Sequence, residues 1–376
     1  MKKFFLFIFI FLFSIKVNAL ADNAKSAILI EASTGEIIYK NNENEKRSPA
    51  SMTKMMSLII IMEEIENGNL KWDEEIKVSK NAASMGGSQI YLEENEVMKV
   101  KDLIKGICMA SANDAVVALA ERISGSEENF VYKMNQKAKE LELKNTKFLN
   151  ATGLDIDGHY SSAYDMALIA KELVKHDKIL EFSSKYEDYL RENTNKKFWL
   201  VNTNKLLKSF EGMDGLKTGY TKNALYCLTA TAKKNNMRLI SVIMGEETSN
   251  VRNQETTELL NYGFNLYKVR NIIKKDKVVY KYTNDKSNVL KTDVITKNAV
   301  NILEKKGGKK RNITYKVSMI EKKLPIKKGE TIGTLTVIEK GKTIYTVPLT
   351  VKKTVKKANV FRLFLNNILS FFTGNF

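Results

Sequence analysis

Positive charge is distributed very unevenly along this chain of 376 residues, and the asymmetry divides it into two parts. Residues 266–376 contribute +19 to the net charge of +18, from 26 lysines and arginines against 7 aspartates and glutamates, whereas residues 22–265 contribute −4. The first part contains long amphipathic stretches, and the second alternates short β-branched runs with lysines. Parts that differ this much are expected to fold as separate units. We predict a junction near residues 262–270.

Residues 1–21 are predicted to be a secretory signal peptide. Two lysines precede an almost purely apolar run over residues 4–15, which is too short to cross a bilayer comfortably. Small residues permit cleavage after Ala19 or after Ala21. An uncleaved anchor is the alternative. Both interpretations place the rest of the chain outside the cytoplasm, at the outer face of the cytoplasmic membrane or in the cell wall space.

Residues 358–376 are predicted to form an amphipathic helix. Apolar residues recur at spacings of three and four, and polar residues fall away from that stripe. The stripe comprises Phe361, Phe364, Leu365, Ile368 and Phe372. Four lysines lead into the helix, which contains an arginine and has too few apolar residues to span a bilayer. We therefore expect it to lie on the outer face of the cytoplasmic membrane. Docking on its own domain is the alternative.

The basic part before this helix, residues 266–357, is predicted to be a small all-β domain. Four runs rich in β-branched residues are separated by turn signals, at residues 277–283, 312–317, 331–338 and 343–351. The charge alone would suit nucleic acid, but export and the lack of a recognition motif argue against that ligand. Anionic lipid head groups or acidic wall polymers fit better. A lysine-rich solvated surface without a ligand is the alternative.

Ser51 and Lys54 form the only Ser-x-x-Lys string of the chain. They stand at a predicted helix entrance, and residues three apart on a helix share a face. A serine hydroxyl is a poor nucleophile until a base takes its proton, and a lysine can do so if burial and neighbouring cations lower its pKa. The first helical turn also favours negative charge at Ser51. We predict that Ser51 is a nucleophile and Lys54 its base, with a surface serine and a solvated lysine as the alternative.

Ser111 and Asn113 lie between an apolar run and a second helical stretch. Ser111 is a candidate proton relay to a leaving group, and the amide of Asn113 is suited to hold Lys54 and a substrate backbone. Helix N-capping is the alternative role. A competing Ser-x-Asn string begins at Ser79, in a polar stretch without a helix pattern after it, and we interpret it as a chance match.

Lys217, Thr218 and Gly219 form the only Lys-Thr-Gly string, between a turn-rich approach and two predicted strands. On a hairpin edge, Lys217 offers a charge and Thr218 a hydroxyl to a carboxylate, and Gly219 lets a substrate backbone approach closely. An ordinary turn would explain this string by itself. The three strings occur in order behind an export signal, and together they indicate acyl transfer through a serine ester.

With these strings the chain resembles the penicillin-binding, serine-type D-alanyl-D-alanine carboxypeptidases, whose motifs are Ser-x-x-Lys, Ser-x-Asn and Lys-Thr-Gly. Further similar segments begin at residues 85, 109, 151, 159, 201, 215 and 259. The resemblance is close over residues 24–265 and looser beyond. It implies an α/β (α+β) fold: a β-lactamase-like transpeptidase domain with an antiparallel sheet flanked by helices, then a small all-β domain and an amphipathic helix.

The resemblance also implies a mechanism. Ser51 would attack the penultimate D-alanine of a peptidoglycan stem pentapeptide, Lys54 would be the base, and water would hydrolyse the acyl-enzyme. Lys217, Thr218 and Arg252 would hold the terminal carboxylate. β-Lactams would trap Ser51, and no metal or organic cofactor is implied. His159 is expected to support the site without acting as its base.

Three other interpretations share these residues. A serine β-lactamase of class A would carry a Glu-x-x-Leu-Asn string between the second and third motifs, and none occurs there. An endopeptidase acting on cross-linked peptidoglycan would use the same residues. A catalytically inactive wall- or membrane-binding protein would normally have lost a motif residue.

Cys108 and Cys227 lie in apolar contexts and are expected to be two buried thiols, because two cysteines do not make a disulfide framework.

Overall fold

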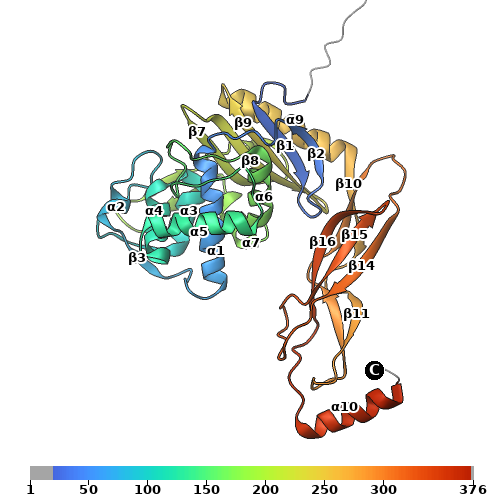
Figure 1. The fold of residues 1–376 in the computed structure, drawn as a ribbon. Helices are drawn as coiled ribbons and strands as arrows, with labels where there is room; N and C mark the ends of the chain where they lie inside the picture. Colours follow the sequence, from blue (N-terminus) through green and yellow to red (C-terminus); the bar gives the residue numbers. More distant parts are fainter. Residues whose placement is uncertain (1–19, 374–376) are drawn as a thin grey trace, which may run out of the picture.

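The computed structural model describes residues 20–373 and consists of two units followed by a helix (Figure 1). We call residues 20–266 the N-terminal unit and residues 267–357 the C-terminal unit. The predicted signal peptide lies outside the described residues except for its last two positions. Helix α9 ends at residue 266 and strand β10 begins at residue 267, within the predicted junction.

The N-terminal unit is built on a five-stranded sheet in the order β2-β1-β9-β8-β7, and every neighbouring pair is antiparallel. Its strands are β1 (Ser26–Glu31), β2 (Ile37–Asn41), β7 (Met213–Thr221), β8 (Leu225–Lys234) and β9 (Met237–Glu246). Strands from both ends of the unit therefore meet in one sheet. Two short ribbons pair β3 (Glu75–Lys77) with β4 (Val97–Lys99) and β5 (Glu187–Leu190) with β6 (Phe198–Val201).

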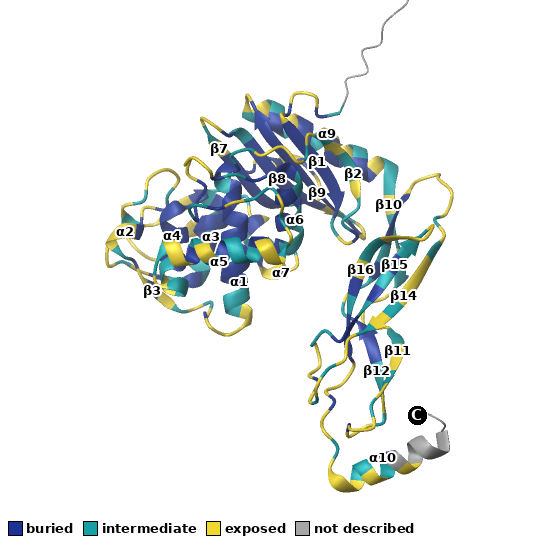
Figure 2. Ribbon diagram, viewed as in Figure 1, coloured by how far each residue is buried: buried dark blue, intermediate teal, exposed yellow. Residues whose placement is uncertain are grey.

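Helices cover both faces of this sheet, as the resemblance implied. The helices are η1 (Ala50–Thr53), α1 (Lys54–Glu66), α2 (Lys80–Ala83), α3 (Val100–Ala110), α4 (Asn113–Ser124), α5 (Glu127–Glu140), α6 (Ala163–Leu173), α7 (Asp177–Ser183), α8 (Leu206–Ser209) and α9 (Ser249–Leu266). Side chains alternate across a strand, so Ile28 and Ile30 pack with the α1 and α6 helices, whereas Leu29 packs under α9. The apolar α1 is buried at the centre of the helical layer (Figure 2).

The C-terminal unit packs a β10–β13 ribbon and a sheet of order β11-β12-β16-β15-β14 around one apolar core. Its strands are β10 (Tyr267–Ile273), β11 (Val278–Thr283), β12 (Lys291–Thr296), β13 (Val300–Lys305), β14 (Ile313–Met319), β15 (Gly333–Glu339) and β16 (Lys342–Val351). The four predicted strands are confirmed as β11, β14, β15 and β16. The sequence interpretation missed β10, β12 and β13.

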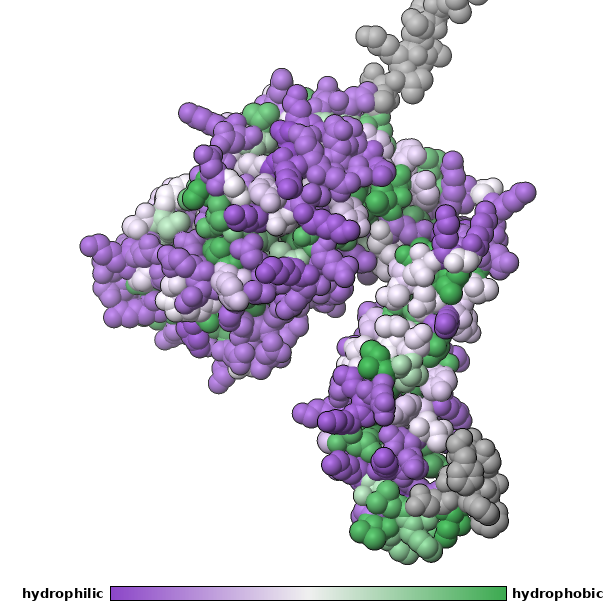
Figure 3. Space-filling model, in the orientation of Figure 1, coloured by the Kyte–Doolittle hydropathy of each residue, from purple (hydrophilic) through white to green (hydrophobic). Residues whose placement is uncertain are grey.

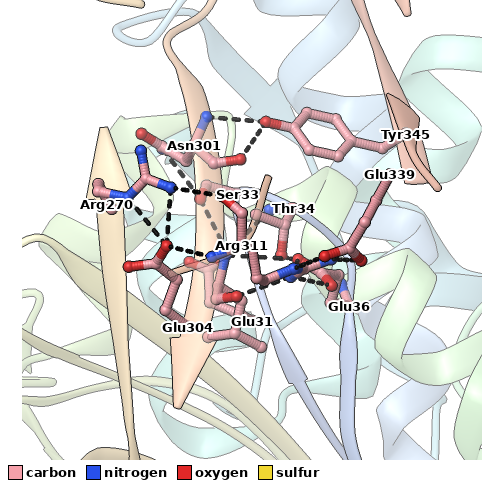
Figure 4. Close-up of polar contacts among 11 residues, drawn as sticks. Glu31, Ser33, Thr34, Glu36, Arg270, Asn301, Glu304, Arg311, Glu339 and Tyr345 are labelled. Carbon is pink, nitrogen blue, oxygen red and sulfur yellow. Dashed lines mark hydrogen bonds and ion pairs between the residues drawn. The ribbon is translucent and has the colours of Figure 1, made fainter. Parts of the chain in front are cut away.

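Arg311 joins the two units (Figure 4). Its Nη1 donates to both carboxylate oxygens of Glu36, just before β2, at 2.9 and 2.6 Å. Its Nε and Nη2 donate to Glu339 of β15 at 3.0 and 2.9 Å. Both carboxylates raise the pKa of Arg311. Beside this contact, Asn301 donates to the Ser33 hydroxyl at 3.0 Å. The junction is thus held by charged and polar groups from both units.

The chain continues into α10 (Val360–Thr373), the helix at the far end of the C-terminal unit. Val360, Phe361 and Phe364 are largely exposed, and the space-filling view shows apolar residues gathered at this end of the molecule (Figure 3). Asn366 is buried and donates to the backbone carbonyls of Asp285 and Ser287, at 2.8 Å each. Within residues 20–373, no helix has both the length and the apolar composition needed to cross a bilayer.

Candidate active site

Ser51 lies in the short 3₁₀ helix η1, and Lys54 is the first residue of α1. The Nζ of Lys54 is 2.9 Å from Ser51 Oγ and donates a second hydrogen bond of 2.7 Å to the carbonyl of Thr152. Lys54 is completely buried. The backbone carbonyl of Thr152 therefore orients the Lys54 amine, which also forms a hydrogen bond with the Ser51 hydroxyl.

The surroundings of Lys54 favour its neutral form. Burial, together with the nearby Lys217 ammonium, lowers the pKa of Lys54 well below its ordinary value, and the buried Asp114 carboxylate opposes this shift. The Asp114 carboxylate accepts backbone N–H groups from Ile90 and Leu92, at distances of 3.0 to 3.2 Å. A neutral amine in hydrogen-bond contact with a hydroxyl is chemically able to take its proton.

Ser111 occupies the break between α3 and α4 in a left-handed conformation, with φ +63°. It caps neither helix by a side-chain bond, and its buried Oγ has no partner among residues 20–373. Asn113, the first residue of α4, donates from Nδ2 to the carbonyl of Gly86 at 2.6 Å, and its Oδ1 is also unpartnered within the described chain. N-capping therefore does not explain these residues, and both retain polar atoms for a ligand.

Strand β7 carries Lys217, Thr218 and Gly219 along the edge of the sheet, next to η1. Lys217 is buried and donates to the carbonyl of Thr218 at 2.9 Å. Burial lowers the pKa of Lys217 to about 7, an effect that the Arg252 charge strengthens. A Cβ at Gly219 would lie 2.9 Å from the carbonyl oxygen of Pro49, so only glycine lets the strand pack this closely on η1.

These elements enclose a cleft of about 550 Å³. Its lining residues are Ser51, Ser88, Ser111, Val201, Thr203, Lys205, Thr218, Gly219, Tyr220, Tyr226, Ser249, Asn250, Arg252 and Asn253. Of the eight predicted site residues, five line the cleft. The others, Lys54, Asn113 and Lys217, are buried, and Lys54 reaches the cleft through its contact with Ser51.

Three contributors were not assigned a role from the sequence. The Thr152 carbonyl orients Lys54, Asp114 supports the start of α4, and the Thr203 hydroxyl accepts a hydrogen bond of 2.7 Å from Thr218. All three lie in segments whose sequences are similar to the carboxypeptidase family, and that similarity was the only sign of their importance. Their functions depend on backbone geometry and on tertiary contacts.

His159 does not contact the reactive pair by hydrogen bonding. Its Nδ1 accepts the backbone N–H of Leu149 at 3.1 Å, so its Nε2–H faces Thr53 Oγ1 at 2.9 Å. Burial lowers the pKa of His159 to about 4, and the ring is neutral at physiological pH. These contacts support the predicted structural role of His159.

Ser79 lies away from the cleft and caps α2, where its hydroxyl accepts the N–H of Ala82 at 2.9 Å. The expectation that no helix follows it was wrong, because one capped turn needs little apolar pattern. Cys108 and Cys227 are both free and buried, as predicted.

Comparisons with known proteins agree with this arrangement. A family model described as D-alanyl-D-alanine carboxypeptidase matches residues 14–248, and one described as penicillin-binding protein 5, C-terminal domain, matches residues 267–357. The D-alanyl-D-alanine carboxypeptidase DacF of Bacillus subtilis is 49% identical over 95% of this chain and 92% of its own length.

Two solved structures are also similar. Penicillin-binding protein 5 from Haemophilus influenzae has a TM-score of 0.70 at 31% identity, covering 89% of this chain and 98% of its own. Penicillin-binding protein D2 from Listeria monocytogenes, in an ampicillin-bound form, has a TM-score of 0.59 at 32% identity, covering 66% and 99% respectively.

Proposed function

This chain belongs to the D-alanyl-D-alanine carboxypeptidase family, and we propose that it removes the terminal D-alanine from peptidoglycan stem pentapeptides through an acyl-enzyme on Ser51. The observation that carries this proposal is the contact between a completely buried Lys54 and Ser51 Oγ at the wall of a cleft. It supplies a nucleophile, its base and room for a peptide in one place.

Acylation begins when Ser51 Oγ attacks the carbonyl carbon of the penultimate D-alanine and its proton passes to Lys54 Nζ. The tetrahedral intermediate then collapses, the C–N bond breaks, and the proton held by Lys54 passes to the departing amine, which leaves Lys54 neutral again. Ser111 is suited to relay that proton, because its unpartnered hydroxyl lines the cleft. Water then attacks the carbonyl carbon of the Ser51 ester while Lys54 takes its proton, the bond between that carbon and Ser51 Oγ breaks, and the proton returns to Ser51 Oγ as the shortened peptide leaves.

The terminal carboxylate of the substrate is assigned to the β7 edge. Thr218 and Arg252 line the cleft, and the buried Lys217 precedes Thr218 on β7, close enough for the Arg252 charge to lower its pKa. Lys205 and Arg252 line the cleft, Lys217 is nearby and no carboxylate lines it, which favours an anionic ligand. Asn113, with one free amide oxygen, is suited to hold the substrate backbone. Because these groups bind a free carboxylate, the enzyme should cleave the last peptide bond of a chain in preference to an internal one.

A β-lactam resembles the acylated dipeptide and should form the same ester. One of the similar structures is described as ampicillin-bound, which supports this expectation for a relative. Intact mass spectrometry of the purified protein after ampicillin treatment should show one added drug, and peptide mapping should place it on Ser51. An adduct that persists in Ser51→Ala would contradict the assignment of the nucleophile.

We also propose that residues 1–21 direct export and that α10 attaches the enzyme to the outer face of the cytoplasmic membrane. Support comes from the exposure of Val360, Phe361 and Phe364, while Asn366 ties the helix to the C-terminal unit. Deleting residues 359–376 should abolish flotation with phosphatidylglycerol vesicles while β-lactam binding persists. Serine replacements at Phe361 and Phe364 should act similarly. Continued flotation of both variants would refute the anchor.

A further inference from the structure

Two buried carboxyl groups lie together outside the catalytic cleft. Glu246 ends strand β9 and Glu255 lies in the second turn of α9, and their exposures are only 1% and 3%. Glu246 Oε1 and Glu255 Oε2 have no hydrogen-bond partner within the described residues. Burying a carboxylate without a compensating charge is costly, so this pair calls for a cation.

The pair is already contacted by the beginning of the described chain. The backbone N–H and the side-chain Nδ2 of Asn23 both donate to Glu255 Oε1, at 2.8 and 2.9 Å. Burial, a hydrogen bond between the two side chains and the Glu255 charge raise the pKa of Glu246 to about 8, so the two carboxyls share a proton near neutrality and carry one negative charge between them. The remaining negative charge of the pair lies beside residue 23, and within the described chain no N–H or O–H donor of a third residue reaches Glu246 Oε1 or Glu255 Oε2.

Neighbouring charges do not supply a close cation. Lys25 partly offsets the repulsion at Glu246, whereas the exposed Glu247 adds to it. Arg47 packs on the Gly245 backbone and pairs with Glu45 at 2.7 Å. From β2, Tyr39 faces both Glu255 and Asp22, and these carboxylates help to raise the pKa of its phenol. Within the described structure, neither Lys25 nor Arg47 forms an ion pair with Glu246 or Glu255.

Export would create the missing cation. Cleavage after Ala21 makes Asp22 the first residue, and its new α-amino group is one residue from the Asn23 N–H that binds Glu255. Consecutive Cα atoms are only about 3.8 Å apart, so the new amine, once freed from the preceding residue, is close enough to turn toward the glutamate pair. We propose that Glu246 and Glu255 form the binding site for the α-ammonium group that signal-peptide removal creates at Asp22.

Removal of the signal peptide would then replace the contacts of Leu20 and Ala21 with contacts of the new α-ammonium group. In the unprocessed chain the Tyr39 hydroxyl donates to the carbonyl of Leu20, and Ala21 is buried. Cleavage removes both residues, and an ammonium with three donors takes the place of that neutral contact. Glu255 lies one turn after Arg252 in α9, so the ion pair fastens the helix turn that reaches the cleft. The inference rests on the proposed export and is independent of the catalytic assignment.

The test compares two forms of residues 22–376 that differ only at the amine. One begins with a free Asp22, released from a fusion without extra residues, and the other carries an Nα-acetyl group. At pH 7 the free form should have a thermal midpoint higher by about 4–8 °C. Glu246→Gln and Glu255→Gln should remove this difference, and Glu247→Gln, an exposed neighbour, should retain it.

The pH dependence has a defined sign. Carboxylates should raise the pKa of the bound amine above its ordinary value of about 7.7–8.0, so the added stability is complete below that value and disappears as pH rises through the folded pKa. It also disappears in acid as the glutamates are protonated. An NMR titration of the isotopically labelled α-amine should give the raised pKa directly.

Equal midpoints of the two forms at pH 7, or an α-amine pKa at its ordinary value, would overturn the proposal. So would an exported protein whose mass shows Leu20 as its first residue. D-Alanine release is measured in both forms as a separate readout. Absence of release from both would count against the catalytic proposal, while the midpoint difference would still decide the role of the glutamate pair.

Discussion

Gly153→Ala should inactivate the enzyme, although the glycine lies outside the three motifs. Gly153 follows Thr152, whose carbonyl orients Lys54, and it has a φ of +84°. A Cβ built at this position would lie 1.8 Å from the carbonyl oxygen of Ala50 and 2.4 Å from its carbonyl carbon. Because Ala50 directly precedes Ser51, the clash displaces either the nucleophile or the carbonyl that aligns its base.

The expected loss of folding stability in Gly153→Ala has two parts. A left-handed conformation costs a non-glycine residue about 1–2 kcal/mol. Overpacking against backbone that cannot rotate away adds about 1–3 kcal/mol. The sum is about 2–5 kcal/mol, a large part of a typical stability of about 5–15 kcal/mol. A displacement near 1 Å at Ser51 would also slow acylation by about 100-fold.

Gly158 offers a matched control in the same loop. It has a φ of +86°, but its Cβ would meet only Leu149, at 3.5 Å, an ordinary contact. Gly158→Ala should therefore lose stability through the backbone term alone and acylate at nearly the native rate. The assay is the rate of covalent β-lactam binding together with thermal denaturation. Equal acylation rates in the two variants would refute the packing argument.

Four further outcomes are expected. Lys217 loses its charge as pH rises through about 7, so the KM for a peptide with a free carboxylate should rise above that pH. Lys217→Gln should abolish this rise, and a variant whose KM still rises above about pH 7 would contradict the assignment. The same substitution removes a cation that lowers the pKa of Lys54, so the acid limb of acylation should move to higher pH. Arg311→Met should lower the thermal midpoint by several degrees, because it leaves two carboxylates without their partner, and an unchanged midpoint would argue against a stabilising junction. Burial raises the thiol pKa to about 12 for Cys108 and about 11 for Cys227, so neither should react with a thiol reagent at pH 8 until the protein unfolds.

The reactive groups were largely predictable because their chemistry resides in side chains with fixed spacing. Ser51 and Lys54 are three residues apart at a helix entrance, which already brings them together. The contribution of Thr152 was not predictable in the same way, because a backbone carbonyl is common to every residue. Its position follows from tertiary packing of a loop against α1, nearly 100 residues away.

The fold shows a similar division. Local patterns identified four strands of the C-terminal unit, whereas β12 and β13 mix polar with apolar residues without a clear alternation. The central sheet pairs β1 with β9, more than 200 residues later, and no local pattern specifies that partner. The left-handed Ser111 was interpreted as a possible N-cap, because a serine before a helix has that preference. Its open hydroxyl became evident only from the surrounding structure.

D-Alanine release is the most direct test of the central claim. The protein beginning at Asp22 should be incubated with a peptide ending in Lys-D-Ala-D-Ala, with Ser51→Ala as the matched control, and free D-alanine should be measured over time. The account predicts release by the native protein and none by the variant, with both equally folded. Absence of release from a folded, β-lactam-reactive native protein would contradict it, and so would equal release by the two proteins.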